Sequence, residues 1–234
     1  MKRRLPDRAD WAPWKLSGAD RLTALSYAVV DVETTGGSPM RGDRVTEIAA
    51  VIVRDGRIDE TFETLVDPQR SIPPFVTRLT HITQSMVRGQ PFFREIAPHV
   101  ADLLRGRVFV GHNATFDRRF VRAEASRAGY ELPGNRVLCT VRLARRLVPH
   151  LRRRSLDVLA RYYDVPISAR HRAMGDAMAT ARCFLRMLDE AGARGLDTWE
   201  DLATFVGPRT PLAKGRARRR RTALPTVGEF EFGA

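Results

Sequence analysis

An apolar run with two carboxylates at its end constrains the fold of this chain more than any other feature. Residues 25–32 are nearly all apolar and β-favouring, as is typical of a central strand buried on both faces. Asp31 and Glu33 lie at its end, and alternation along a strand places both side chains on one face. Two such carboxylates lose hydration and repel each other, which favours a compensating cation. For this pair alone, a solvated strand end remains the alternative.

The remaining pattern predicts an α/β fold built around that strand. Asp55-Gly56 is typical of a tight hairpin turn, so three adjacent strands form an antiparallel meander. Two later strands alternate with helices, as parallel units do. Strands are expected at residues 25–32, 45–54, 57–66, 107–110 and 137–139. Helices are expected near residues 83–87, 92–104, 115–128, 140–148, 155–163, 173–191 and 197–206. Prolines at positions 68, 73 and 74 predict a loop.

Composition divides the chain into three parts. Residues 1–24 are expected to form an irregular leader, which contains Trp11 and Trp14, and residues 25–206 to form one folded domain. Residues 207–234 are rich in arginine and lack apolar periodicity, so we expect a basic, disordered tail. The chain has two cysteines, and their positions suit neither a disulfide framework nor a zinc site.

The chain carries a strong excess of positive charge, with 40 Lys and Arg against 27 Asp and Glu and a formal net charge of +13. Such an excess favours nucleic acid or an anionic membrane as a partner. It is also typical of a soluble protein from an arginine-rich genome. No apolar run approaches the ~18 residues that a transmembrane helix needs, and no apolar segment of a signal peptide follows the basic N-terminus. We therefore expect a soluble, cytoplasmic protein without a membrane partner.

Two later segments carry further reactive side chains. Asp117 lies in the first turn of the helix expected near residues 115–128, where the helix dipole favours an anion. Asp176 lies at the start of the helix expected near residues 173–191, and His171 precedes it from a loop. A histidine there can take a proton from water, since its pKa lies near working pH. Taken singly, Asp117 is also typical of a helix-capping acid and His171 of a surface residue.

Three segments together resemble a known family. The sequence DVETTG begins at Asp31, GHNATFD ends at Asp117, and H-x₄-D joins His171 to Asp176. These resemble, in order, the three exonuclease motifs of the DnaQ-like family in its DEDDh branch, which includes the proofreading subunit of bacterial DNA polymerase III. The resemblance covers roughly residues 26–188. It implies a ribonuclease H-like fold, with a mixed five-stranded sheet, an antiparallel three-strand meander and flanking helices.

The resemblance also implies roles for single residues. Asp31, Glu33 and Asp176 would hold one divalent metal ion, Asp31 would reach a second ion that Asp117 supports, and His171 would be the general base. The two ions would be Mg²⁺ or Mn²⁺, which prefer oxygen ligands. Residues expected to bind the substrate are Thr34, Thr35, Gly36, Ile82, Asn113 and Phe116. Of these, Phe116 is more typical of a core position than of a stacking one.

The implied function is metal-dependent 3′→5′ exonuclease activity in DNA proofreading or repair. The partner would be nucleic acid with a free 3′ end, DNA in preference to RNA, as single strands or frayed ends that yield nucleoside 5′-monophosphates. A DNA polymerase or repair complex is a further candidate partner, and no oligomeric state is predicted. One alternative is an exoribonuclease that trims RNA 3′ ends or short oligoribonucleotides, because the same five residues serve both substrates. Another is a non-catalytic nucleic-acid-binding module.

Overall fold

A five-stranded mixed sheet lies at the centre of the computed structural model, which describes residues 17–132, 134 and 136–207. The strands are β1 (Tyr27–Thr34), β2 (Val45–Arg54), β3 (Arg57–Leu65), β4 (Val108–Gly111) and β5 (Val137–Cys139). Their order is β3-β2-β1-β4-β5. The first three strands pair antiparallel, whereas β4 pairs parallel with β1 and β5 pairs parallel with β4. The predicted α/β class and the meander within a mixed sheet are confirmed.

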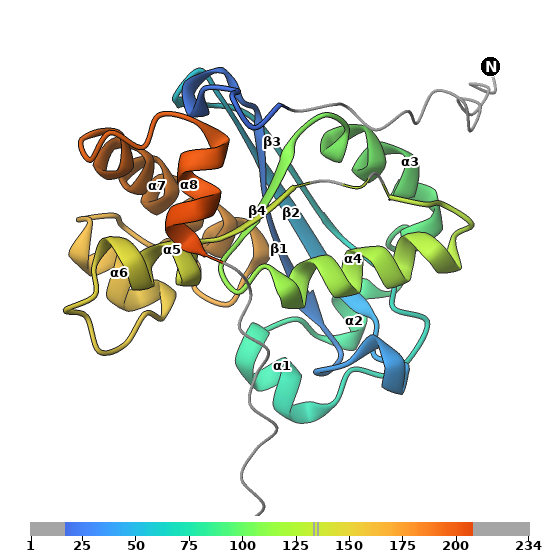
Figure 1. Cartoon of the computed structure of the whole chain (residues 1–234). Coiled ribbons are helices and arrows are strands. Elements are labelled where there is room, and N and C mark those ends of the chain that lie inside the picture. The colour runs from blue at the N-terminus through green and yellow to red at the C-terminus, as the bar shows by residue number, and fades with distance from the viewer. Residues whose placement is uncertain (1–16, 133, 135, 208–234) are drawn as a thin grey trace, which may run out of the picture.

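Helices cover both faces of the sheet (Figure 1). One face carries α3 (Phe93–Leu104) and α4 (Thr115–Arg127). The other carries α5 (Thr140–Leu147), α6 (Leu156–Tyr162), α7 (Ala173–Gly192) and α8 (Trp199–Val206). Two short helices, α1 (Pro74–Thr80) and α2 (Gln84–Val87), lie near the end of β1. Among the described helices, none combines the length and apolar content needed to cross a bilayer.

Strand β1 separates two hydrophobic cores because its side chains alternate between the two faces of the sheet. Tyr27 and Val29 belong to the core beneath α7, whereas Ala28 and Val30 belong to the core beneath α3 and α4. Continuing the same alternation, Asp31 and Glu33 share the face of Tyr27 and Val29. The carboxylates of β1 therefore lie on the side of the sheet that α7 covers.

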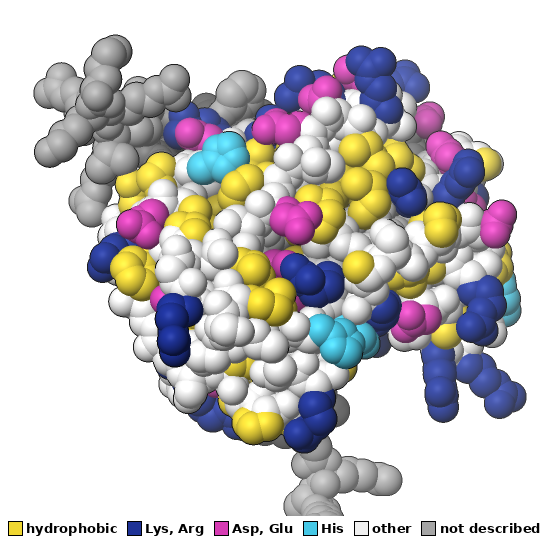
Figure 2. Space-filling view, turned by 180° about the vertical axis from the view of Figure 1, so that it is seen from behind, with side chains coloured by type: hydrophobic (Ala, Val, Ile, Leu, Met, Phe, Trp, Pro, Cys, Tyr) yellow, Lys and Arg dark blue, Asp and Glu magenta, His cyan; other side chains and the backbone are white. Residues whose placement is uncertain are grey.

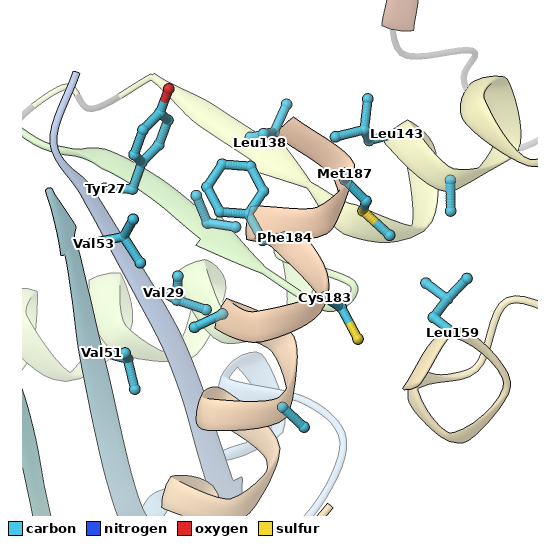
Figure 3. Close-up of a cluster of buried hydrophobic side chains, with 14 of the residues drawn as sticks. Tyr27, Val29, Val51, Val53, Leu138, Leu143, Leu159, Cys183, Phe184 and Met187 are labelled. Atoms are coloured by element: carbon cyan, nitrogen blue, oxygen red, sulfur yellow. The ribbon is translucent and has the colours of Figure 1, made fainter. Parts of the chain in front are cut away.

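Packing against this face holds α7 on the sheet (Figure 3). Phe184 of α7 is fully buried, and its ring meets the ring of Tyr27 edge-on with centroids 4.9 Å apart. Burying a phenylalanine side chain stabilises a fold by about 1.5–3 kcal/mol. Val51 and Val53 of β2 line the same core. Strands β1 and β2 are thus fixed relative to α7.

The loop predicted at the prolines is confirmed around Pro68 and Pro73 but ends at Pro74, where a helix begins. Pro74 is the first residue of α1. At that position the missing N–H removes no intrahelical hydrogen bond, and the fixed φ of proline suits a helix. Together α1, α2 and the turns beside them enclose a small core of Ile72, Val76, Ile82 and Val87. The prediction treated proline only as a helix breaker and overlooked this use.

The last residues of the predicted leader pack on the domain. Leu22 is buried, and its amide donates to the carbonyl of Asp197 at 2.8 Å. The amide of Trp199 in turn donates to the carbonyl of Asp20 at 2.9 Å. Residues 1–16, with Trp11 and Trp14, lie outside the described residues. The same holds for residues 208–234 of the tail predicted at 207–234, so the predictions for these two segments stay untested.

Candidate active site

The two carboxylates of β1 lie on one face of the strand and are partly shielded from water. Asp31 and Glu33 are both half-buried. Strand β1 continues two residues beyond the predicted end, so Glu33 still pairs with β2, opposite Glu47. The register then shifts between Glu33 and Thr34, and irregularities of this kind re-aim side chains at sheet edges and active sites. Both carboxylates therefore lie on β1 just before the shift in its register with β2.

Asp176 approaches the same carboxylates from the first turn of α7. Oxygens of Asp31, Glu33 and Asp176 all lie within 4.8 Å of one another. Asp176 is buried, and its Oδ2 accepts a hydrogen bond from the Arg170 guanidinium. Its Oδ1 is also buried but has no hydrogen-bond partner within the described part of the chain. The structure thus brings together three predicted site residues that lie 145 positions apart at most.

Asp117 lies beside this group, from α4, without joining the cluster of three. Its side chain is buried, and Oδ1 accepts a hydrogen bond from the backbone amide of Val32 at 3.3 Å. Val32 stands between Asp31 and Glu33, so this contact ties α4 to the acidic end of β1. A Cβ on Gly111 would lie 3.2 Å from Oδ2 of Asp117, which leaves little room for any other residue there.

Burial raises the pKa of every carboxyl in the site, and repulsion from neighbouring site carboxylates raises the pKa of Asp31 and Glu33 further. Burial is the main cause for Asp31, whose pKa is well above its usual range, and the nearby Asp117, Glu33 and Asp176 add to it. Burial also raises the pKa of Glu33 to about 8 and that of Asp117 to about 7. The pKa of Asp176 is raised by burial as well, against the opposing effect of Arg170. The site therefore favours positive charge, either protons or a cation.

The donor set fits a hard divalent cation. The group offers carboxylate oxygens, which Mg²⁺ and Mn²⁺ prefer, at mutual distances within 4.8 Å. Leaving a buried polar atom unsatisfied costs about 1–3 kcal/mol, and Oδ1 of Asp176 is such an atom. A cation held by Asp31, Glu33 and Asp176 would satisfy that oxygen and offset the repulsion.

His171 lies in the loop that enters α7. Its backbone is left-handed, with φ of 61°, which is uncommon for residues other than glycine. Nδ1 of His171 lies 3.4 Å from Nη1 of Arg170, and that Nη1 donates to Oδ2 of Asp176. The predicted base is therefore placed beside the carboxylate cluster.

A glycine allows this loop to lie against α7. A Cβ on Gly175 would meet the carbonyl oxygens of Ser168 and Ala169 at 2.0 and 2.4 Å, distances that a real Cβ does not tolerate. The loop backbone thus rests directly on the first turn of the helix. Gly175 keeps His171 close to Asp176.

The predicted substrate-binding turn after β1 uses its polar groups internally. The Thr34 hydroxyl donates to the carbonyl of Gly36 at 2.6 Å, and the Thr35 hydroxyl accepts from the amide of Arg44 at 3.0 Å. A Cβ on Gly36 would lie 2.6 Å from the carboxylate of Asp43, so glycine is required by close packing. Thr34 and Thr35 are buried, which leaves the turn's backbone rather than its hydroxyls as the surface for a ligand.

The other predicted substrate-binding residues differ in their exposure. Asn113 is exposed and left-handed, with φ of 73°, in the turn before α4. Phe116 is half-buried and packs against Phe120 with ring centroids 4.9 Å apart, as expected of the core position. Ile82 is fully buried in the small core around α1 and α2. Its side chain is 0% exposed, and its predicted role in substrate binding stays a prediction.

Charged residues that the sequence reasoning missed surround the site. Arg170 bridges Asp176 and Asp157, donating from Nε to Oδ1 of Asp157 at 2.9 Å. Arg172 pairs with Glu47, which is 1% exposed. The sequence did contain one signal, because Glu47 is the single charged residue in the apolar run 45–53.

Comparisons with known proteins place the same span of the chain in one family. The exonuclease family model RNase_T matches residues 28–184. A PolC-type DNA polymerase III from Caldanaerobacter subterraneus subsp. tengcongensis is 39% identical over 180 residues, or 77% of this chain and 13% of that protein. The 3′-5′ exonuclease DinG of Bacillus subtilis is 40% identical over 164 residues, or 70% of this chain and 18% of that protein. The chain thus matches less than a fifth of the length of these two relatives.

Solved structures show the same fold. Exonuclease X in complex with 5′ overhanging duplex DNA is 30% identical, with a TM-score of 0.60 that covers 78% of this chain and 99% of that one. E. coli exonuclease I in complex with a dT13 oligonucleotide is 19% identical, with a TM-score of 0.64 over 73% of this chain and 42% of that one, which supports the fold alone. Because the family model covers more than half of the sequence, the chain belongs to the exonuclease family.

Proposed function

We propose that this protein is a metal-dependent 3′→5′ exonuclease that hydrolyses the last phosphodiester of DNA single strands or frayed 3′ ends. The observation that carries the proposal is the cluster of Asp31, Glu33 and Asp176, with His171 next to it through Arg170. The exonuclease names of the relatives support it. The products would be nucleoside 5′-monophosphates. Residues 25–206 would form the exonuclease domain.

The acidic cluster would hold two divalent ions, Mg²⁺ or Mn²⁺, with Asp117 supporting the second. Bound ions of this kind lower the pKa of water and stabilise charge on the scissile phosphate. Asp117 is suited to a supporting role, because its Oδ1 is already engaged by the amide of Val32. Arg170 neutralises part of the site's negative charge by its ion pair with Asp176. Its hydrogen bonds to Asp157 hold the guanidinium next to the carboxylate cluster.

His171 would act as the general base. Its ring lies beside Arg170, and the loop that carries it packs closely on Gly175. A neutral imidazole takes a proton from the attacking water, and general-base catalysis of this kind contributes typically ~10²–10⁴-fold to the rate. His112 is less suited to this role, because burial and Arg170 lower its pKa to about 4.

The charge of the molecule suits a polyanionic substrate. On the face shown in Figure 2, basic side chains are scattered among acidic ones instead of gathering in one patch. The net charge of +13 would therefore act mainly as a diffuse attraction toward the nucleic-acid backbone, weakened by salt. A DNA polymerase or a repair complex is the partner we propose, since the relatives include PolC-type and epsilon-like proteins of DNA polymerase III.

Single-stranded DNA and RNA of the same sequence, labelled in parallel at the 5′ or the 3′ end, test this function. With Mg²⁺, the 5′-labelled DNA should shorten progressively and the 3′-labelled DNA should release labelled mononucleotide at once. Asp176→Asn keeps the shape of the side chain, removes its charge and should abolish release. Unimpaired release by Asp176→Asn, or release in the presence of EDTA, would exclude the proposed site. Faster degradation of RNA would favour the exoribonuclease instead.

His171→Ala should lower kcat on single-stranded DNA by ~10²–10⁴-fold while leaving Mg²⁺ binding intact. The matched control is His99→Ala, which removes an exposed histidine that contacts Phe62 on the opposite side of the sheet. That control should retain the kcat of the native protein. A loss smaller than about tenfold for His171→Ala would argue against its role as base.

Metal-free protein should lose stability as pH rises. The folded-state pKa values of Asp117 and Glu33 are raised to about 7 and about 8. Their contribution to stability is therefore complete below the unfolded pKa near ~4 and is lost as pH rises through about 7 to 8. Mg²⁺ binds the ionised forms, so the increase in Tm that it causes should grow across the same range. A Tm difference between Mg²⁺ and EDTA samples that does not change with pH would contradict this account.

A further inference from the structure

A buried glutamate lies next to the carboxylate cluster without belonging to it. Glu47 of β2 stands directly opposite Glu33 of β1 in the register. Antiparallel partners share one face of a sheet, so Glu47 also faces α7. Its exposure is 1%. A charged group buried this deeply is costly unless it is paired and hydrogen-bonded.

Both carboxylate oxygens of Glu47 accept hydrogen bonds from residues at the N-terminus of α7. Nε of Arg172 lies 3.0 Å from Oε1 and 3.1 Å from Oε2, and Nη2 lies 2.5 Å from Oε1. The backbone amide of Ala173, the first residue of α7, donates to Oε2 at 2.8 Å. Glu47 thus combines a two-pronged ion pair with a cap on the helix N-terminus, where the helix dipole adds to the attraction.

These contacts lie next to the residue proposed as the base. His171 immediately precedes Arg172, and its φ of 61° places it in an uncommon left-handed conformation. Such a conformation is strained and persists only where the surroundings enforce it. Gly175 and the amide of Asp176, which donates to the carbonyl of Arg172 at 3.1 Å, hold the loop from the side of α7. Glu47 holds it from the sheet.

We propose that Glu47 is a positioning residue that fixes His171 through Arg172 and the first amide of α7. The inference rests on the proposed role of His171 as general base. Glu47 is not offered as a metal ligand, because both of its oxygens already accept hydrogen bonds from Arg172 and Ala173. Its carboxylate sets the distance between the base and the end of β1.

Glu47→Gln tests this role with little change in volume. The amide nitrogen of glutamine cannot accept from Arg172, so the two-pronged pair is lost and the loop is released. We expect kcat on single-stranded DNA to fall about tenfold to a hundredfold, as for other small misplacements of a catalytic group. The KM for DNA and the Mg²⁺ concentration for half-maximal rate should remain unchanged.

Glu124→Gln is the matched control. Glu124 of α4 is also 1% exposed, and it also accepts from an arginine and a backbone amide. Nε of Arg44 lies 2.7 Å from Oε1, Nη2 lies 3.0 Å from Oε2, and the amide of Val45 lies 3.3 Å from Oε1. Glu124→Gln should lower Tm to a similar extent as Glu47→Gln and yet retain kcat. An equal loss of kcat in both variants would reduce the role of Glu47 to general stability and overturn the proposal.

Combining Glu47→Gln with His171→Ala separates positioning from other effects. Residues that act through one another are not additive. In the His171→Ala background, Glu47→Gln should therefore leave the residual kcat nearly unchanged. An undiminished tenfold loss in that background, or a raised Mg²⁺ requirement in Glu47→Gln alone, would show that Glu47 acts on the metal site instead and would overturn the proposal.

Arg172→Lys keeps the test decisive if Glu47→Gln does not fold. Lysine retains the charge that Glu47 needs but loses the two-pronged geometry, so kcat should fall while Tm is largely kept. Native kcat in Arg172→Lys would refute the positioning role. Failure of the proposed function is distinguishable, because then the unaltered protein would release no nucleotides, or His171→Ala would remain fully active.

Discussion

Repulsion among carboxylates at the end of a buried strand is the constraint on which the rest of this site depends. Asp31 and Glu33 follow apolar residues on the same face of β1, and Asp176 meets them within 4.8 Å. Burial raises the pKa of each carboxyl. Arg170 offsets only part of this charge, since Oδ1 of Asp176 stays without a partner in the described structure. A cation is the group that such a cluster is suited to bind.

The mixed sheet explains why distant segments converge on this point. Strands β1 and β4 are parallel, so their carboxyl ends lie at the same edge. The chain turns after Gly111 into α4, which places Asp117 against the amide of Val32. Helix α7 crosses the sheet from the other face, and Phe184 packed on Tyr27 fixes its position. The acidic residues therefore come from three separate elements, β1, α4 and α7.

Local patterns predicted the strands and part of the site. Alternation alone predicted that Asp31 and Glu33 share a face, and the strand limits at 45–54 and 137–139 agree with the structure. The convergence of Asp117, His171 and Asp176 came only from family resemblance, because no local rule reports which segments meet in space. The helix at Pro74 was not predicted, because the tertiary packing around it cannot be read from the local sequence. The burial of Ile82 likewise depends on a core that α1 and α2 create. Glu47 was visible as a charge in an apolar strand, but its partner Arg172 lies 125 residues away.

We propose that the carboxylates of β1 and α7 form one divalent-cation site. Isothermal titration calorimetry, in which Mn²⁺ is added to the metal-free protein, measures whether this site binds a cation. The native protein should bind Mn²⁺ saturably, and Asp31→Asn should lose that binding while Asp189→Asn, an exposed position on α7, retains it. Equal Mn²⁺ affinity in the native protein and in Asp31→Asn would contradict the account.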